Sequence, residues 1–141
     1  MASYYKGLEF RTFLEAHWAA FFDLAGWKWS FNPKEIDEWR PDFLVTIPCG
    51  HSECGGDHTL VVSILAVDSL SQVQGHPSLK YSYEVTDADG KWIADAGALF
   101  GKSPSISEWQ MSHGAGGGIE NVLGWVSNAN ELLEKAEIML G

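Results

Sequence analysis

Residues 58–67, His-Thr-Leu-Val-Val-Ser-Ile-Leu-Ala-Val, form a continuous and mostly apolar stretch that is rich in β-branched residues. Successive side chains of a strand point to opposite sides of its sheet, so a strand of this composition must bury both faces. Such a strand belongs in the middle of a sheet that other elements cover. We therefore expect an α/β or α+β fold with a mixed central sheet flanked by helices.

The remaining sequence supplies helices and further strands for this sheet. Residues 8–25 carry apolar side chains at helical spacing and Gly26 is placed to end that helix, while residues 128–140 have the pattern of a second, amphipathic helix. Strands are expected at 27–31, 42–48 and 107–112, and a hairpin at 81–95. The glycine-rich residues 113–118 favour a tight turn leading into the last helix. Because no repeat or linker is apparent, we expect residues 1–141 to form a single domain.

Glu15 has an uncommon position in the first expected helix. Arg11, Glu15, Trp18 and Phe22 fall on one line along it, so the carboxylate lies beside the apolar stripe and not opposite it. Glu15 is therefore either paired with Arg11 at the helix surface or directed into the protein.

Residues 5–31 and the sequence Trp-Arg-Pro-Asp-Phe at 39–43 follow a known pattern. That pattern is Tyr-x-Gly-x-x-Phe-Arg-Ser-x-Leu-Glu-Ala, then Trp-Ala-x-Phe-Phe-Asp, a Trp-x-Tyr strand and Pro-Asp-Phe. The chain thus resembles a phage and bacterial group of the PD-(D/E)xK nuclease superfamily over about its first 67 residues. The resemblance implies a restriction-endonuclease-like fold. The matching residues are Tyr5, Gly7, Phe10, Arg11, Leu14, Glu15, Ala16, Trp18, Ala19, Phe21, Phe22, Asp23, Pro41, Asp42 and Phe43.

The resemblance also implies a metal site, of which this sequence keeps only a part. In such nucleases the helix Glu, the Asp after Pro and the Glu of a Glu-Val-Lys strand hold Mg²⁺, while the Lys positions or helps to activate the attacking water. Glu15 and Asp42 match the first two ligands, whereas Ser63 and Leu65 stand where the strand Glu and Lys would be. If this correspondence is right, all four residues line one cleft.

Ser63 and Leu65 supply neither the carboxylate nor the ammonium group that the chemistry requires. The resemblance therefore implies a catalytically degenerate nuclease, and Mg²⁺ is expected only if the site is active. The alternative is a rearranged site, into which another charged residue moves. The candidates for that role are Glu53, Asp57, Asp68 and Lys80.

Cys49, His51, Cys54 and His58 place four good zinc ligands within ten residues, in a hairpin insert at about 48–58. Short gaps between Cys and His residues let a tight loop surround one Zn²⁺ ion, and four protein ligands imply a structural site. The spacing is not that of a standard zinc finger. The alternative is an ordinary hairpin loop whose thiols and imidazoles bind no metal.

The charge of the chain bears on its partner. Nineteen acidic and nine basic residues give a formal net charge of −10, which repels phosphate and suits a basic partner. A protein partner is therefore favoured, and a nucleic-acid partner follows only from the resemblance. No apolar run approaches the roughly 20 residues that span a bilayer and no secretory signal is visible, so we expect a cytoplasmic protein that has no membrane partner, in the host cell if a phage encodes it.

Three functions are consistent with these observations. The first is a degenerate nuclease-like protein of a phage or mobile element that acts by binding, as an acidic inhibitor of a nucleic-acid-handling or host defence complex. The second is an active Mg²⁺-dependent endonuclease with a rearranged site. The third is a zinc-stabilised structural or accessory protein.

Overall fold

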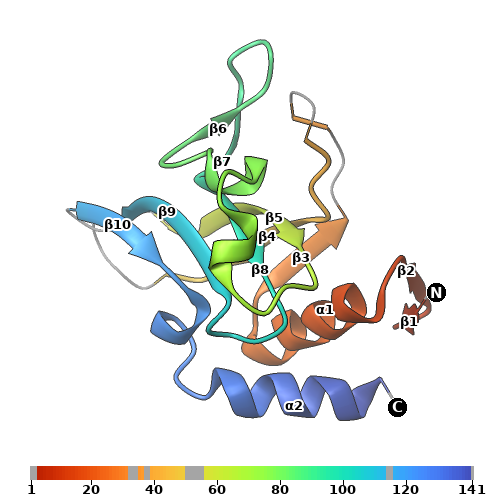
Figure 1. Ribbon diagram of the computed structural model, residues 1–141. Helices are drawn as coiled ribbons and strands as arrows, with labels where there is room; N and C mark the ends of the chain where they lie inside the picture. Colours follow the sequence, from red (N-terminus) through yellow and green to blue (C-terminus); the bar gives the residue numbers. More distant parts are fainter. Residues whose placement is uncertain (1–2, 32–34, 37–38, 50–55, 114–115, 141) are drawn as a thin grey trace.

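The computed structural model describes residues 3–31, 35–36, 39–49, 56–113 and 116–140. Six strands form one mixed sheet in the order β10-β9-β8-β5-β4-β3, in which β5 and β8 are parallel and the other neighbours are antiparallel (Figure 1). Their bounds are β3 Lys28–Phe31, β4 Phe43–Ile47, β5 His58–Ile64, β8 Ala96–Phe100, β9 Ser107–His113 and β10 Gly116–Glu120. The expected mixed central sheet with flanking helices is confirmed.

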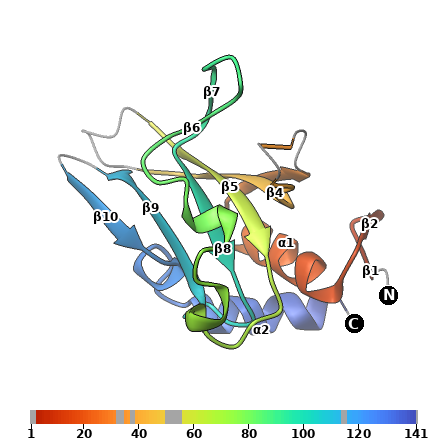
Figure 2. The same cartoon turned by 45° about the horizontal axis from the view of Figure 1, so that its top comes forward.

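Strand β5 lies inside this sheet, as its apolar sequence predicts, and it ends at Ile64. Its side chains alternate between two hydrophobic cores. Leu60, Val62 and Ile64 belong to the main core, which also contains the buried apolar residues of α1 (Phe13–Ala25) and α2 (Ala129–Met139). The two helices lie side by side against one face of the sheet (Figures 1 and 2).

The opposite face of the sheet carries a smaller, second core. Val61 of β5 packs there with Ile36, Trp39, Val85 and Ala94. The last two residues belong to the expected hairpin, whose paired strands are β6 (Val85–Thr86) and β7 (Trp92–Ala94). Short 3-10 helices, η1 (Leu70–Val73) and η2 (Pro77–Leu79), lie between β5 and this hairpin, and η3 (Val122–Gly124) lies between β10 and α2.

The first helix begins later than its apolar spacing predicts. Residues Leu8–Phe10 form strand β2, which pairs with β1 (Ser3–Tyr5) across a turn in which Lys6 and Gly7 both have positive φ. Positive φ at both central residues is the geometry of a tight two-residue hairpin turn. The helix then begins after Thr12, whose side chain caps it by accepting the N–H of Glu15. Gly26 ends the helix in the left-handed region, as expected.

The prediction of a glycine-rich turn into the last helix is wrong for residues 116–118. Gly116, Gly117 and Gly118 begin strand β10, which pairs with β9. Pairing with a neighbouring strand has outweighed the weak strand preference of glycine. Gly118 has a φ of 149°, a conformation that favours glycine, so the unusual composition suits this strand.

In the described part of the chain, no helix is both long enough and apolar enough to span a membrane.

Candidate functional site

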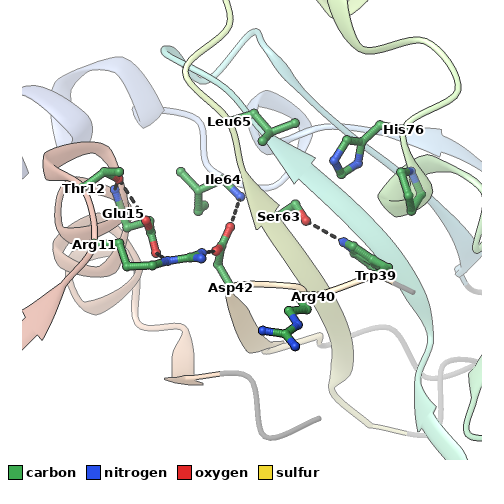
Figure 3. Close-up of a pocket in the computed structure, with 11 residues that line it drawn as sticks. Arg11, Thr12, Glu15, Trp39, Arg40, Asp42, Ser63, Ile64, Leu65 and His76 are labelled. Carbon is green, nitrogen blue, oxygen red and sulfur yellow. Dashed lines mark hydrogen bonds and ion pairs between the residues drawn. The ribbon is translucent and has the colours of Figure 1, made fainter. Parts of the chain in front are cut away.

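Glu15, Asp42, Ser63 and Leu65 line one cavity of about 510 Å³ (Figure 3). The register of the sheet explains how the last three meet. Phe43 of β4 pairs with Val62 of β5, so the next step of the ladder places Asp42 across from Ser63, and Leu65 follows two residues later. Glu15 comes from the first turn of α1, which packs beside this end of the sheet.

Asp42 is buried at the floor of the cleft, with only 7% of its side chain exposed. One carboxylate oxygen accepts the backbone N–H of Ile64 at 2.7 Å, and the other forms an ion pair with Arg11. Burial raises the pKa of Asp42, and the nearby carboxylate of Glu15 raises it further, whereas the Ile64 N–H and Arg11 act in the opposite direction. The net effect is a pKa above the ordinary value. The contacts with Ile64 and Arg11 therefore do not fully offset the cost of burying the charged carboxylate.

Glu15 shares its cation with Asp42. Its side chain is 8% exposed, and its Oε1 lies 3.6 Å from Nε of Arg11. Its Oε2 accepts the hydroxyl of Thr12 at 3.0 Å. Both interpretations of Glu15 drawn from the sequence therefore hold, because the carboxylate pairs with Arg11 and is also directed into a cleft.

Ser63 faces the other wall of the cleft. Its hydroxyl accepts the indole N–H of Trp39 at 2.8 Å, and the ring of Trp39 stacks on Tyr81 with centroids 5.3 Å apart. Ser63 is buried, its hydroxyl oxygen is already hydrogen-bonded to Trp39, and this oxygen points away from the two carboxylates (Figure 3). Leu65 is held just beyond β5 by a 2.9 Å hydrogen bond from its N–H to the carbonyl of Phe100.

Sequence reasoning missed other residues that line the cavity, notably Trp39, Arg40 and His76. Trp39 and Arg40 stand directly before Pro-Asp, so their place in the sequence was a usable signal. His76 had no such signal, because it is far from Pro-Asp in the sequence. It reaches the cavity as the capping residue of the short helix η2. Its Nδ1 accepts the N–H of Ser78 at 3.1 Å, so the neutral ring carries its proton on Nε2, and burial lowers its pKa.

Of the charged residues proposed for a rearranged site, the three that the structure describes, Asp57, Asp68 and Lys80, do not line this cavity. Asp57 accepts the N–H of Cys49 at 3.4 Å, and Asp68 forms an ion pair with Lys102 at 3.4 Å. Lys80 follows η2 and is also outside the cavity lining. Glu53 lies outside the described residues.

The candidate zinc ligands are described only in part, because His51 and Cys54 lie outside the described residues. His58, at the start of β5, is buried, with Nδ1 3.6 Å from Asp95 and its ring against Trp125. Within the described ranges, no group of three or more His, Cys, Asp or Glu side chains is placed to hold a metal ion. The zinc site stays a prediction.

The residues of the cleft do not fit the Mg²⁺ site that the resemblance implies. Mg²⁺ prefers several oxygen ligands in octahedral geometry. Here the guanidinium group of Arg11 lies between the two carboxylates, the Ser63 hydroxyl is held by Trp39, and Leu65 offers no polar atom. We therefore assign no reaction step to a metal ion.

No protein-family model matches this chain, and neither does any curated protein or solved structure with which it was compared. The correspondence of Ser63 and Leu65 to a missing Glu and Lys thus depends on the sequence resemblance and on their place in the cleft.

Proposed function

We propose that this protein is a nuclease-like scaffold without catalytic competence, and that it acts by binding another macromolecule. The observation that carries the proposal is that Ser63 and Leu65 share one cleft with Glu15 and Asp42. A cleft that keeps two acidic groups, but presents a neutral hydroxyl and an alkyl group where the chemistry needs a carboxylate and an ammonium, cannot assemble the four-group site.

The expected loss of rate is large. Removing one group that stabilises developing charge in a transition state typically costs about 10²–10³-fold in turnover. Two such groups are replaced here, so phosphodiester hydrolysis should lie about 10⁴-fold or more below that of a complete site.

A nuclease assay tests this proposal. Purified protein is incubated with single-stranded and duplex DNA and with RNA, in the presence of Mg²⁺ or Mn²⁺, and Asp42→Ala serves as the matched control. We expect the two proteins to give the same background. Cleavage by the wild-type protein that Asp42→Ala abolishes would overturn the proposal.

That contrary outcome defines a second candidate function, a metal-dependent endonuclease with a rearranged site. The observation in its favour is that two buried carboxylates share a cleft with the imidazole of His76. The lowered pKa of His76 keeps the ring neutral at neutral pH, and because Nδ1 accepts the Ser78 N–H, the ring can act as a hydrogen-bond donor through Nε2. Loss of cleavage in both Asp42→Ala and His76→Ala would identify this arrangement.

We further propose that the binding partner is a protein with a basic groove, such as a nucleic-acid-handling enzyme or a host defence complex. A net charge of −10 favours a basic partner. Helix α2 supports this choice, because Glu131, Glu134 and Glu137 are exposed at helical spacing along it, with Lys135 as the one cation among them. In this proposal the protein occupies the groove in place of nucleic acid.

A further inference from the structure

A smaller cavity, of about 280 Å³, shares no lining residue with the cleft that holds Glu15 and Asp42. Helix α1, helix α2 and the turn between β8 and β9 contribute to its lining, with His17, Leu133 and Lys102 among the residues. Pockets that take drug-sized ligands typically measure about 300–1,000 Å³. This cavity is therefore of a size that suits a single side chain.

Hydrogen bonds between the elements hold the walls of this cavity. Nε2 of His17 lies 2.6 Å from the carbonyl oxygen of Leu133, which joins α1 to α2. The indole N–H of Trp18 donates to the carbonyl oxygen of Gly101 at 2.8 Å, which holds the β8–β9 turn against α1. The cavity is thus formed by the fold before any ligand arrives.

His17 supplies an acceptor atom inside this frame. A carbonyl oxygen can only accept, so Nε2 carries the proton in the bond to Leu133, and Nδ1 of the neutral ring keeps a lone pair. The residue is 8% exposed and lines the cavity, and among the described residues no hydrogen bond or ion pair engages Nδ1. A ligand that donates a hydrogen bond would satisfy this atom.

The charged side chains around the cavity favour a cationic ligand. Glu134 and Glu137 line it from α2, and both are exposed. Lys102 is the one lysine or arginine among the described lining residues, and its ammonium group pairs at 3.4 Å with Asp68, which does not line the cavity. Two carboxylates and an acceptor nitrogen thus face a single ammonium group that already has a counter-ion.

We propose that this cavity binds an arginine side chain of the partner, whose guanidinium group donates to the carboxylates of Glu134 and Glu137 and to Nδ1 of His17. The guanidinium group presents five N–H donors in a planar fork and is more weakly hydrated than an ammonium group, so it suits several acceptors in a small cavity better than lysine does. The inference rests on the proposed function, in which a basic protein binds the acidic side of α2.

Binding is measured by NMR with isotope-labelled protein at neutral pH and low salt, and the probe is Nα-acetyl-arginine amide. The matched control ligand is Nα-acetyl-citrulline amide, which has a similar shape but no charge. We expect the arginine probe to shift the ring nitrogens of His17 and the backbone amides of Glu134 and Glu137 in a saturable manner. The citrulline probe should bind about fivefold more weakly or worse, because its hydrogen bonds are not charge-assisted.

Three exposed positions of α2 provide matched protein variants. Glu134→Gln and Glu137→Gln should each weaken binding of the arginine probe about two- to fivefold, as expected for ion pairs at the mouth of a cavity. Glu131→Gln removes the same charge from the same helix, but Glu131 does not line the cavity, so binding should be unchanged. Because all three side chains are exposed, these substitutions should leave the fold intact.

Three results would overturn the inference. The first is an arginine probe that leaves the ring nitrogens of His17 unshifted, and the second is equal binding of the citrulline probe. The third is equal weakening by all three substitutions, which would reduce the effect to net charge. The proposed function fails on other evidence, namely metal-dependent cleavage that Asp42→Ala abolishes, so the two can fail separately.

Discussion

The side chain of Asp42 is held by specific contacts, although burial makes its ionised form unfavourable. Its carboxylate accepts a backbone N–H and pairs with Arg11, yet its pKa is raised, chiefly because the group is buried. A raised pKa means that the folded protein holds this proton more tightly than the unfolded chain does. The protonated form therefore adds stability at low pH, and this contribution is lost as the pH rises from the ordinary value of 3.8 through the raised pKa.

Two substitutions of Asp42 separate its charge from its hydrogen bond. Asn keeps an oxygen for the N–H of Ile64 but carries no charge, so Asp42→Asn should be at least as stable as wild type at pH 7, with the difference shrinking in acid. Asp42→Ala leaves that buried N–H without its acceptor and should lose about 1–3 kcal/mol. Urea unfolding at pH 7 and at pH 4 measures both effects, and a large loss in Asp42→Asn at pH 7 would contradict this account of the charge.

The pairing of Arg11 with Asp42 could not be derived from local sequence rules. The two residues are 31 positions apart, and only the packing of α1 beside the end of the β4–β5 pair brings them together. The pairing of Arg11 with Glu15 was foreseeable, because four residues separate them in a helical pattern. Helical periodicity thus predicted the Arg11–Glu15 ion pair but not the Arg11–Asp42 ion pair.

Among the elements, the N-terminal hairpin β1–β2 is attached by the buried side chains of Tyr5 and Phe10 and by one carboxylate, that of Asp23. Asp23 of α1 accepts the hydroxyl of Tyr5 at 2.6 Å and the indole N–H of Trp29 at 3.0 Å, and it pairs with Lys6 at 3.0 Å. Burial alone would raise the pKa of Asp23, but the hydrogen bonds from Tyr5, Lys6 and Trp29 outweigh it, so the pKa is lowered. Asp23 therefore joins the hairpin, the helix and strand β3.

Asp23→Asn should destabilise the protein by about 1 kcal/mol at neutral pH, because charge-assisted hydrogen bonds become neutral ones. A lowered pKa gives stability that is complete above the unfolded value of 3.8 and is lost as the pH falls through the folded value. The difference between the variant and wild type should therefore fade as the pH falls below 3.8 and through the lowered pKa of Asp23. Chemical denaturation across this pH range tests the prediction, and a difference that does not change with pH would refute it.

The elements also show where sequence patterns succeed. Strand β5 was predictable, because an apolar run with β-branched residues fits only an interior strand. The start of α1 was not, because the apolar positions Leu8 and Phe10 continue the helical spacing although they belong to β2. The cap at Thr12 decides the boundary, and its three-residue spacing to Glu15 was a signal present in the sequence.

For the molecule as a whole, the net charge of −10 indicates a binding surface only when the positions of the acidic side chains on the surface are known. Leu133 and Ala136 of α2 are buried in the main core, and the carboxylates Glu131, Glu134 and Glu137 face outward. The folded protein thus presents acidic groups on the outer side of a rigid helix. Such a surface favours fast association with a basic partner, and the association weakens with salt.

This proposed face can be tested by charge reversal. Once a partner has been captured and purified, replacing Glu131, Glu134 and Glu137 with Lys should weaken its binding tenfold or more in roughly 0.1 M salt. A control with the same change in net charge replaces Glu9, Glu84 and Asp89, which are exposed on other elements. Equal weakening in both proteins would show that net charge alone matters, and a ternary complex with duplex DNA would contradict occupation of the groove.

The parallel pairing of β5 with β8 has a consequence for how the chain acquires its structure. The elements that position the cleft carboxylates lie close together in the sequence. Helix α1 carries Glu15 and comes first, and β4 and β5, which form an antiparallel pair next to Asp42, follow it. The centre of the sheet is completed only when Leu60 meets Ala96, across an intervening segment that holds η1, η2 and the β6–β7 hairpin. Because closing a loop over such a separation is the slower event, we expect the ion-pair network of Arg11 to assemble before β5 pairs with β8.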